Sequence, residues 1–333
     1  MWRFLLFLFL LGLVAAGLFF ADYSDTLDSP LEFTESQRVF VVEKGWSSKR
    51  VATELETKGI LNKPHWFYLY ARMSEKGALI KSGEYNITGS PTIPDLIDLF
   101  IDGQTVQYVG KIIEGSSFKQ LRTQLSNNTD LVQTMNSMSD EDIMKALGME
   151  GQHPEGLFFS DTFQFPNQTT DIEFLKRANS LLNSVLQEEW EQRNKDIPIE
   201  TPYEALILAS IVEKETAEPS ERPLIAGVFM SRLNKKMRLQ TDPTVIYGIG
   251  DQYDGNIRRS DLTTDTPYNT YTRAGLPPTP ISMVGHEAIR AVMQPEETKA
   301  LYFVARHDGS GTHQFSENIE QHNAAVRKYQ LKR

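Results

Sequence analysis

The first twenty residues constrain this chain more than any other segment. Residues 4–20 are 17 consecutive apolar residues and glycines, with no charged side chain among them. At about 1.5 Å per residue, a helix over this run would be roughly 25 Å long, a short but adequate length to cross a bilayer. The run therefore predicts a membrane-spanning helix over residues 1–21.

The charges on either side of the apolar run indicate its orientation. Arg3 precedes the run, and several acidic residues follow it before the first basic one, Arg38. These acidic residues are Asp22, Asp25, Asp28, Glu32 and Glu35. The positive-inside rule then predicts a single-pass protein of the cell inner membrane, with its N-terminus in the cytoplasm and its bulk in the periplasm. The alternative is a signal peptide cleaved near Ala16, but the run continues to Phe20, which favours an uncleaved anchor.

Composition excludes several classes of protein. The chain has 333 residues, a formal net charge of −10 and no cysteine. The length suggests about two domains, and the acidity argues against a nucleic-acid partner, which would need a basic face. Without cysteine there can be no disulfide scaffold, cysteine nucleophile, thiolate zinc site or iron–sulfur cluster. A cysteine-free exported chain also avoids unwanted oxidation.

The remaining chain predicts an α+β protein in three parts. Residues 22–37 are polar and acidic and indicate a linker. Residues 38–105 predict a small α/β module, and residues 106–333 a larger mixed α/β domain. The elements expected in the small module are a strand over 39–42, a helix capped by Ser47 or Ser48, a helix after Pro64, a strand over 83–87 and a helix after Thr92. A strand over 301–305 and a last helix are expected near the C-terminus, and residues 126–200 are expected to be helical and polar, broken by an aromatic stretch.

A strand followed by a glycine turn occurs twice, at Gly45 and at Gly115. With these glycines aligned, Val51 corresponds to Leu121 and Leu55 to Leu125. The match fits an internal repeat and fits chance equally well, because strand–turn–helix units are common.

The segment over 201–216 is the best candidate for chemistry. Thr201-Pro202-Tyr203-Glu204 is a capping box with proline at the first helical position. The helix that it opens is apolar nearly all round and is therefore expected to be buried. It ends in Glu213-Lys214-Glu215, where two carboxylates lie at the unfavourable end of the helix dipole.

The two glutamates cannot both line one pocket on a regular helix. They are two residues apart and so point about 200° apart around the axis. Glu215 follows Ile211 and Leu208 on the most apolar stripe, where a carboxyl should have a raised pKa and suit a general acid. The alternative is that both are solvated residues at a helix end, paired with Lys214 or Arg222.

Three later loops are rich in hydrogen-bonding side chains and aromatic rings. They cover residues 240–244, 268–271 and 275–278. Amides and carboxylates can hold sugar hydroxyls, and rings can pack on the apolar faces of sugars. The same compositions also occur in ordinary turns.

Several motifs together resemble the endolytic murein transglycosylase (YceG-like) family. They lie at residues 209–216, 238–248, 267–271, 275–278 and 311–316, with His322-Asn323 after them. The segment that begins Glu155-Gly156 also resembles a family motif, although Ser160 stands where proline is usual and Phe163 where another aromatic is usual.

The resemblance implies a membrane-anchored lytic transglycosylase without cofactor or metal. Residues 38–105 would be a LysM-like subdomain, and Glu215 the catalytic acid/base. The substrate-binding residues would be Glu155, Glu213, Gln240, Thr241, Asp242, Tyr268, Asn269, Thr270 and Tyr271. Such an enzyme cleaves the MurNAc–GlcNAc bond within nascent glycan strands and leaves a 1,6-anhydro-MurNAc end. Its partners would be the glycan strands and neighbouring cell-wall synthases, and its role would be to terminate or trim strand elongation.

Other signals and functions remain as alternatives. Ser116-Ser117-Phe118-Lys119 matches the S-x-x-K pattern of penicillin-binding enzymes, but the other motifs of that family do not follow in order. The six histidines show no metal-ligand spacing, and His313 and His322 are expected to serve structure or hydrogen bonding. A non-catalytic peptidoglycan-binding protein and a hydrolytic muramidase with Asp242 as second carboxylate are the competing functions.

Overall fold

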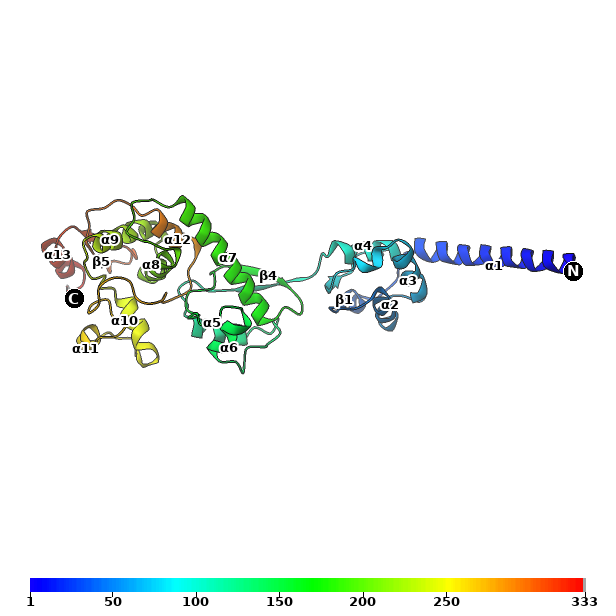
Figure 1. Cartoon of the computed structure of the whole chain (residues 1–333), viewed down its shortest axis with the longest axis horizontal. Coiled ribbons are helices and arrows are strands. Elements are labelled where there is room, and N and C mark those ends of the chain that lie inside the picture. Colours follow the sequence, from blue (N-terminus) through cyan, green and yellow to red (C-terminus); the bar gives the residue numbers. More distant parts are fainter. Residues whose placement is uncertain (332–333) are drawn as a thin grey trace. The chain divides into compact units, whose positions relative to one another are not determined.

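The computed structural model describes residues 1–331 and divides the chain into two compact units. Unit 1 comprises Met1–Tyr108 and Gln164–Gln168, and unit 2 comprises Val109–Phe163 and the chain from Thr169 onward. Both units combine helices with small two-stranded sheets, as Figure 1 shows for each. The predicted mixture of helix and sheet is therefore confirmed.

Unit 1 is built around one antiparallel strand pair. Its elements are α1 (Trp2–Asp28), η1 (Glu35–Gln37), β1 (Val39–Val42), α2 (Ser48–Thr57), α3 (Pro64–Met73), η2 (Lys76–Ala78), β2 (Gly83–Asn86) and α4 (Ile93–Asp102). Val39 lies opposite Asn86, and Val42 lies opposite Gly83. Ser47 caps α2 and Thr92 caps α4, because each side chain accepts a hydrogen bond from the third helical N–H. The order strand–helix–helix–strand agrees with the expected module, and its LysM-like character stays a prediction.

Helix α1 is longer than the sequence predicts. The predicted linker begins at residue 22, whereas α1 continues to Asp28. The reason is tertiary contact that local composition does not reveal: Asp22 forms an ion pair with Lys63 and accepts a hydrogen bond of 3.0 Å from Nε1 of Trp66. Leu27 joins the core of unit 1. Residues 22–28 are therefore a packed helix end rather than a linker.

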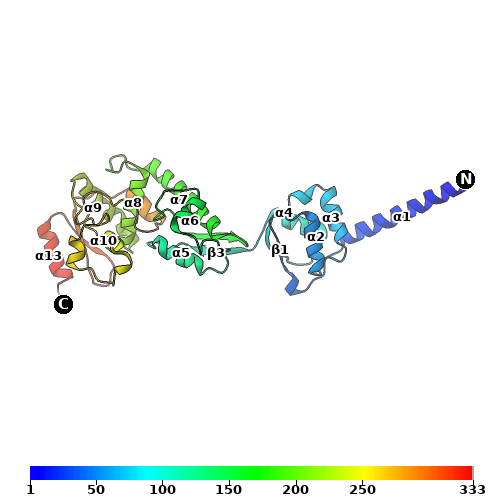
Figure 2. The same ribbon diagram turned by 60° about the horizontal axis from the view of Figure 1, so that its bottom comes forward.

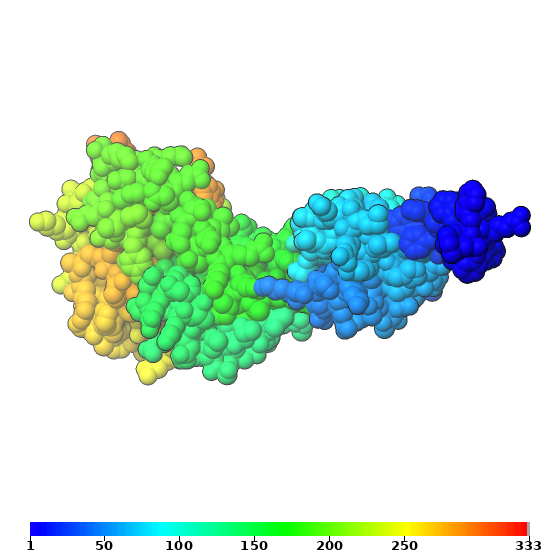
Figure 3. Space-filling view, turned by 45° about the vertical axis from the view of Figure 1, so that its right-hand side comes forward, coloured from blue at the N-terminus to red at the C-terminus, as the bar shows by residue number. Residues whose placement is uncertain are grey.

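The N-terminal part of α1 has the composition of a membrane span. Its most apolar 18-residue window has a mean hydropathy of 2.7, and none of that window is buried. Figure 3 shows this part projecting from the rest of unit 1. An N-terminal apolar helix of this kind is consistent with a membrane anchor or a signal sequence.

Unit 2 is larger and mostly helical. Its helices are α5 (Phe118–Ser126), α6 (Asp140–Ala146), α7 (Asp171–Gln192), α8 (Pro202–Glu215), η3 (Pro219–Glu221), α9 (Arg222–Asn234), α10 (Asp242–Ile249), η4 (Gly250–Gln252), α11 (Arg259–Thr263), α12 (His286–Met293) and α13 (Ile319–Tyr329). Its strands β5 (Tyr302–Ala305) and β6 (His313–Ser316) pair antiparallel, so the strand and last helix expected near the C-terminus are present. The chain passes between the units through β3 (Gln107–Lys111) and β4 (Thr162–Pro166), which pair with each other.

Helix α8 lies at the centre of unit 2. Thr201 and Glu204 form the expected capping box, and every residue from Ala205 to Glu213 is buried. The helix packs against α7, α9, α10 and α12, and Figure 2 shows it among the first three of these. The predicted burial is confirmed, and the C-terminal end of α8 is thereby held in a fixed position.

Candidate active site

The two glutamates at the end of α8 face different surroundings. The side chain of Glu213 is 2% exposed; its Oε1 lies 2.7 Å from Nη2 of Arg222, and its Oε2 accepts a hydrogen bond of 3.0 Å from the Gly285 N–H. Glu215 instead accepts a hydrogen bond from the hydroxyl of Thr241. The separation expected from helix geometry is confirmed.

Glu213 is part of a buried ion pair. Arg222 also lies 3.7 Å from Glu114, so one guanidinium faces two carboxylates. Burial raises the pKa of Glu213, while the Gly285 N–H and Arg222 oppose the rise. The structure therefore places Glu213 in the packing of unit 2, away from the pocket that Glu215 lines.

Glu215 lines a pocket of about 490 Å³, which we call the Glu215 pocket. It is lined by Glu215, Arg232, Leu239, Gln240, Thr241, Asp242, Tyr271, Tyr302, Phe303, Val304, Ala305, His313, Ile319, His322, Val326 and Gln330. Four of the predicted substrate-binding residues belong to it, namely Gln240, Thr241, Asp242 and Tyr271. Gln240 and Thr241 directly precede α10, Asp242 is its first residue, and Tyr271 comes from the loop after α11.

The loop that carries Thr241 is tied to the loop that carries Tyr271. Gln240 has a φ of 47°, a left-handed conformation, and its N–H donates to the carbonyl of Thr270 at 3.2 Å. The Thr241 N–H donates to Oγ1 of Thr270 at 3.1 Å, and this oxygen lies 2.9 Å from Oγ1 of Thr244. These bonds hold the hydroxyl of Thr241 in place beside Glu215.

Asn269 and Thr270, two predicted substrate-binding residues, hold this loop together. They are 1% and 2% exposed. The side-chain amide of Asn269 donates to the carbonyls of Asp261, Leu262 and Thr264 at 2.7–3.3 Å. Their polar groups are thus already bonded within the protein, which makes them supports of the site rather than part of its lining.

The surroundings of Glu215 favour its neutral form near pH 7. Burial raises the pKa of Glu215 to about 7, and the carboxylate of Asp242 adds to the rise. The Thr241 hydroxyl and the Arg232 guanidinium act in the opposite direction. A carboxyl with this pKa can both give and take a proton at neutral pH, as a general acid/base must.

Two further groups frame the carboxyl. The hydroxyl of Tyr271 donates to Oδ1 of Asp242 at 2.6 Å, and burial raises the pKa of Tyr271, which keeps that hydroxyl protonated. Arg232 is 6% exposed and donates through Nε to the Leu301 carbonyl and through Nη1 to the Leu239 carbonyl, both at 2.6 Å. A fixed cation and a hydrogen-bonded carboxylate thus lie in the same pocket as Glu215.

Glu155 and Tyr268 lie in a second pocket, of about 810 Å³. Lys214 and Pro243 line this pocket, whereas their chain neighbours Glu215 and Asp242 line the first one. The two pockets therefore flank the junction between the end of α8 and the start of α10. Six of the nine predicted binding residues are divided between them, four in the first and two in the second.

Glu155 is a buried carboxyl at the start of α5. Its Oε1 accepts a hydrogen bond of 3.0 Å from the N–H of Phe118, the first residue of that helix. Burial raises the pKa of Glu155 to about 7, and the Phe118 N–H and the Tyr247 hydroxyl oppose the rise. Glu155 caps a helix, and its pocket is the second one rather than that of Glu215.

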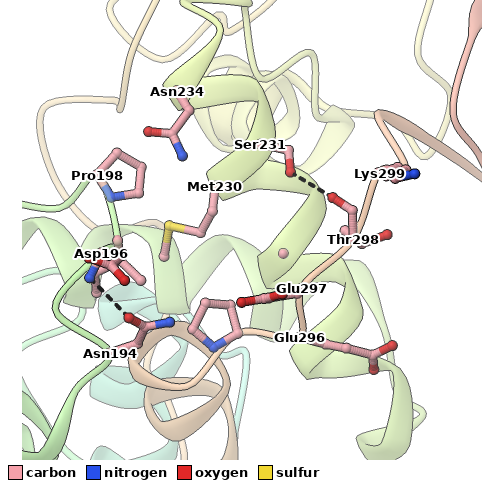
Figure 4. A pocket seen from close by; sticks show the side chains of 13 residues that line it. Asn194, Asp196, Pro198, Met230, Ser231, Asn234, Glu296, Glu297, Thr298 and Lys299 are labelled. Carbon is pink, nitrogen blue, oxygen red and sulfur yellow. Dashed lines mark hydrogen bonds between the residues drawn. The ribbon is translucent and has the colours of Figure 1, made fainter.

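A third cavity, of about 460 Å³, contains none of the predicted site residues. Figure 4 shows its lining, where Oγ of Ser231 donates to the Thr298 carbonyl at 3.2 Å. Helix α9 lies close to the loop that carries Glu296. At Gly227 of this helix, a Cβ atom would lie 2.1 Å from the carbonyl oxygen of Glu296. The close approach explains the glycine by packing.

Sequence reasoning missed four residues of the Glu215 pocket: Arg232, Tyr302, His313 and His322. The ring of His322 stacks on the ring of Tyr302, with 5.2 Å between their centres. The guanidinium carbon of Arg232 lies 5.1 Å from the centre of the Tyr302 ring. Both histidines belong to quoted motifs, and the sequence predicted a structural or hydrogen-bonding role for them rather than a place in the lining of this pocket. The signal that could have found Arg232 is an arginine within the apolar stretch 223–233.

Known proteins resemble this chain over most of its length. The model of the YceG-like family matches residues 40–328. A Bacillus subtilis protein named endolytic murein transglycosylase is 29% identical over 341 residues, which cover 95% of this chain and 91% of that protein. A Streptococcus pneumoniae protein of the same name is 26% identical over 361 residues, covering 97% of this chain and 64% of its own length. The crystal structure of a yceG-like protein from Listeria monocytogenes is 27% identical with a TM-score of 0.52, covering 86% of this chain and 98% of that one.

Proposed function

Because this chain belongs to the YceG-like family, we propose that it is a lytic transglycosylase that cleaves peptidoglycan between MurNAc and GlcNAc. The names of its Bacillus and Streptococcus relatives support this class of enzyme. The observation that carries the proposal is a single carboxyl, Glu215, whose pKa burial raises to about 7 at the wall of an open pocket. The bond cleaved, the catalytic residue and the product are parts of this proposal.

The first step is protonation of the leaving group. Glu215 in its neutral form gives its proton to the glycosidic oxygen while the bond from that oxygen to C1 of the muramyl residue breaks. The 2-acetamido group of the muramyl residue can assist from the opposite face, as in substrate-assisted glycosidases. Arg232 lies in the same pocket and stabilises the carboxylate that Glu215 becomes.

The second step closes the anhydro ring. The Glu215 carboxylate takes the proton of the muramyl 6-hydroxyl, and O6 forms the new bond to C1. The product is a 1,6-anhydro-MurNAc end, Glu215 is again protonated, and no water is consumed. One acid/base group suffices because the substrate supplies the nucleophile.

The other residues have distinct parts in this proposal. Gln240, Asp242 and Tyr271 contact the sugar beside Glu215, and Thr241 orients the Glu215 carboxyl. Glu155 and Tyr268 contact a neighbouring part of the glycan strand in the second pocket. Asn269, Thr270 and Glu213 support the site without touching substrate.

We further propose that α1 anchors the protein in the inner membrane, with unit 2 in the periplasm. Residues 38–105 would bind glycan as a LysM-like module. An enzyme held at the membrane acts on new strands next to the cell-wall synthases and ends or trims their elongation. The apolar length of α1 and the charges around it support the anchor.

The test is digestion of purified peptidoglycan, followed by mass spectrometry. The wild-type protein should release muropeptides with anhydro ends, which are lighter by one water than hydrolytic products. Glu215→Gln should abolish this release with its fold intact, and a Glu218→Gln variant, which changes a half-buried glutamate three residues later, should keep it.

Three results would contradict the proposal. Anhydro release by Glu215→Gln would remove Glu215 from the catalytic role. Products with reducing ends would identify a hydrolytic muramidase, for which Asp242 is the second carboxylate. Absence of any release by the wild type would favour a non-catalytic peptidoglycan-binding protein.

A further inference from the structure

The Glu215 pocket contains an imidazole that the proposed mechanism does not use. His313 begins β6 and lines the pocket, and Glu221 in η3 lies behind it. Nδ1 of His313 lies 2.7 Å from Oε2 of Glu221, and the backbone N–H of His313 donates to Oε1 at 2.8 Å. One carboxylate therefore binds the same histidine twice.

The protein holds this histidine in one orientation. The side chains of His313 and Glu221 are only 11% and 13% exposed. The ring of Phe303 on β5 meets the imidazole edge-on at 5.4 Å, and Ala305 lies opposite His313 in the strand pair. The β5–β6 pair and η3 thus fix the ring from two directions.

Glu221 also links this histidine to the catalytic helix. Helix α8 ends at Glu215, and η3 covers Pro219–Glu221. The chain that positions the proposed acid therefore reaches the partner of His313 within six residues. Such a short connection suits two groups that act on one substrate.

The carboxylate decides which nitrogen of His313 can accept a hydrogen bond. A carboxylate accepts, so Nδ1 carries the proton, and in the neutral ring Nε2 keeps a lone pair. Among residues 1–331, Nε2 of His313 has no hydrogen-bond partner. With the imidazole neutral, Nε2 is thus an acceptor held in one orientation at the pocket that His313 lines.

An acceptor complements the other groups of the pocket. Arg232 is a donor, and neutral Glu215 donates the reacting proton. Sugar rings carry O–H and N–H donors, which need acceptors when water is removed. Oδ1 of Asp242 already accepts from Tyr271, and Nε2 of His313 adds a further acceptor that remains free within the described chain.

We propose that His313 is a second substrate-contacting residue of the Glu215 pocket, with Nε2 accepting a hydrogen bond from an O–H or N–H of the glycan. Glu221 is a positioning residue that acts through His313. This inference rests on the proposed function, because it takes the sugar strand as the ligand.

His313→Asn is the decisive variant. The Asn side-chain amide can take the place of Nδ1 and keep the bond to Glu221, but nothing replaces Nε2. The full-length protein is assayed on soluble glycan strands for anhydro products, and kcat and KM are determined separately. We expect kcat/KM to fall about tenfold, as for the loss of one hydrogen bond to substrate, with an unchanged melting temperature.

Three more variants separate contact from folding. His313→Gln keeps a polar group near Nε2 but loses the bond to Glu221, and it should retain more activity than His313→Asn. Glu221→Gln should lower kcat/KM, and the double variant Glu221→Gln/His313→Asn should be no worse than His313→Asn alone, because Glu221 acts only through the ring.

The chain offers a matched control. His286 forms a similar pair with Glu189, at 2.8 Å, outside the Glu215 pocket. His286→Asn should leave kcat/KM unchanged. A His313→Asn variant with wild-type kcat/KM would overturn the inference and leave the proposed function standing. Losses of activity in the His313 variants that merely parallel losses in their melting temperatures would do the same. A wild-type protein that forms no anhydro product would overturn both.

Discussion

Replacing Glu215 by glutamine should stabilise the protein at neutral pH. Burial raises the pKa of Glu215 from its ordinary value of 4.5 to about 7. Between these pH values the unfolded chain loses the proton while the folded chain keeps it, so ionisation favours unfolding. The contribution of this carboxyl to stability is thus fully present below pH 4.5 and is lost as the pH rises through 7.

The size of the effect follows from the two pKa values. A change of one pKa unit corresponds to about 1.4 kcal/mol, so moving this carboxyl from 4.5 to about 7 is worth roughly 3 kcal/mol. Glutamine is neutral at every pH, and its carbonyl can still accept the hydrogen bond from Thr241. At pH 8, Glu215→Gln should therefore unfold at a melting temperature about 6–12 °C above the wild type.

The assay is thermal unfolding of both proteins at a series of pH values from 4 to 8. The two curves should meet at the acid end and diverge between about pH 4.5 and 7. Because Glu155 also has its pKa raised to about 7, the variant should keep part of the pH dependence. Curves that stay parallel across the series would refute a neutral buried carboxyl at position 215.

Glu218→Gln is the control of opposite sign. Hydrogen bonds from the Ser220 hydroxyl and N–H lower the pKa of Glu218. A carboxyl whose pKa is lowered in the folded state contributes stability at pH values above its ordinary pKa. This contribution is lost as the pH falls. This variant should therefore show no gain in stability at pH 8.

Two more predictions concern supports of the fold. Glu213→Gln should destabilise unit 2 by about 3 kcal/mol, because it leaves Arg222 buried without its closest anion. Thermal unfolding measures this loss. The double variant Glu213→Met/Arg222→Met should recover part of it, because neither charge is then buried. Trp66→Ala should lower the stability of unit 1 by about 3–5 kcal/mol, because the Trp66 side chain is 4% exposed and donates a hydrogen bond to Asp22 on α1. The variant should also be cleaved by protease within residues 22–37. A variant that resists protease would contradict this packing.

Local signals in the sequence were enough for the elements that depend on local chemistry. The capping box at Thr201 and the all-round apolar pattern after it predict α8 and its burial, because both follow from the helix itself. Strand β4 and the last turns of α1 were missed. Their stability comes from partners far away in the chain, β3 for one and Trp66 for the other.

The site was predicted only in part, for a similar reason. Helix geometry separates Glu213 from Glu215 and leaves Lys214 and Arg222 as possible partners, but only the structure shows that Arg222 pairs with Glu213 and that this pair is buried. The side chains of a polar loop can form hydrogen bonds to a ligand or to other groups of the protein, and composition does not distinguish these two cases. Asn269 and Thr270 form hydrogen bonds within the protein, whereas Asp242 and Tyr271 line the Glu215 pocket.

The same surroundings must serve Glu215 both as an acid and as a base. The helix dipole and burial disfavour its carboxylate, which makes the neutral acid available near pH 7. If nothing opposed them, the proton could be given only at a high cost. Thr241 and Arg232 stabilise the carboxylate once it forms, and they are fixed by bonds to Thr270, Leu239 and Leu301 that need not change during the reaction. A pKa near neutrality is thus the balance that lets one carboxyl complete both proton transfers.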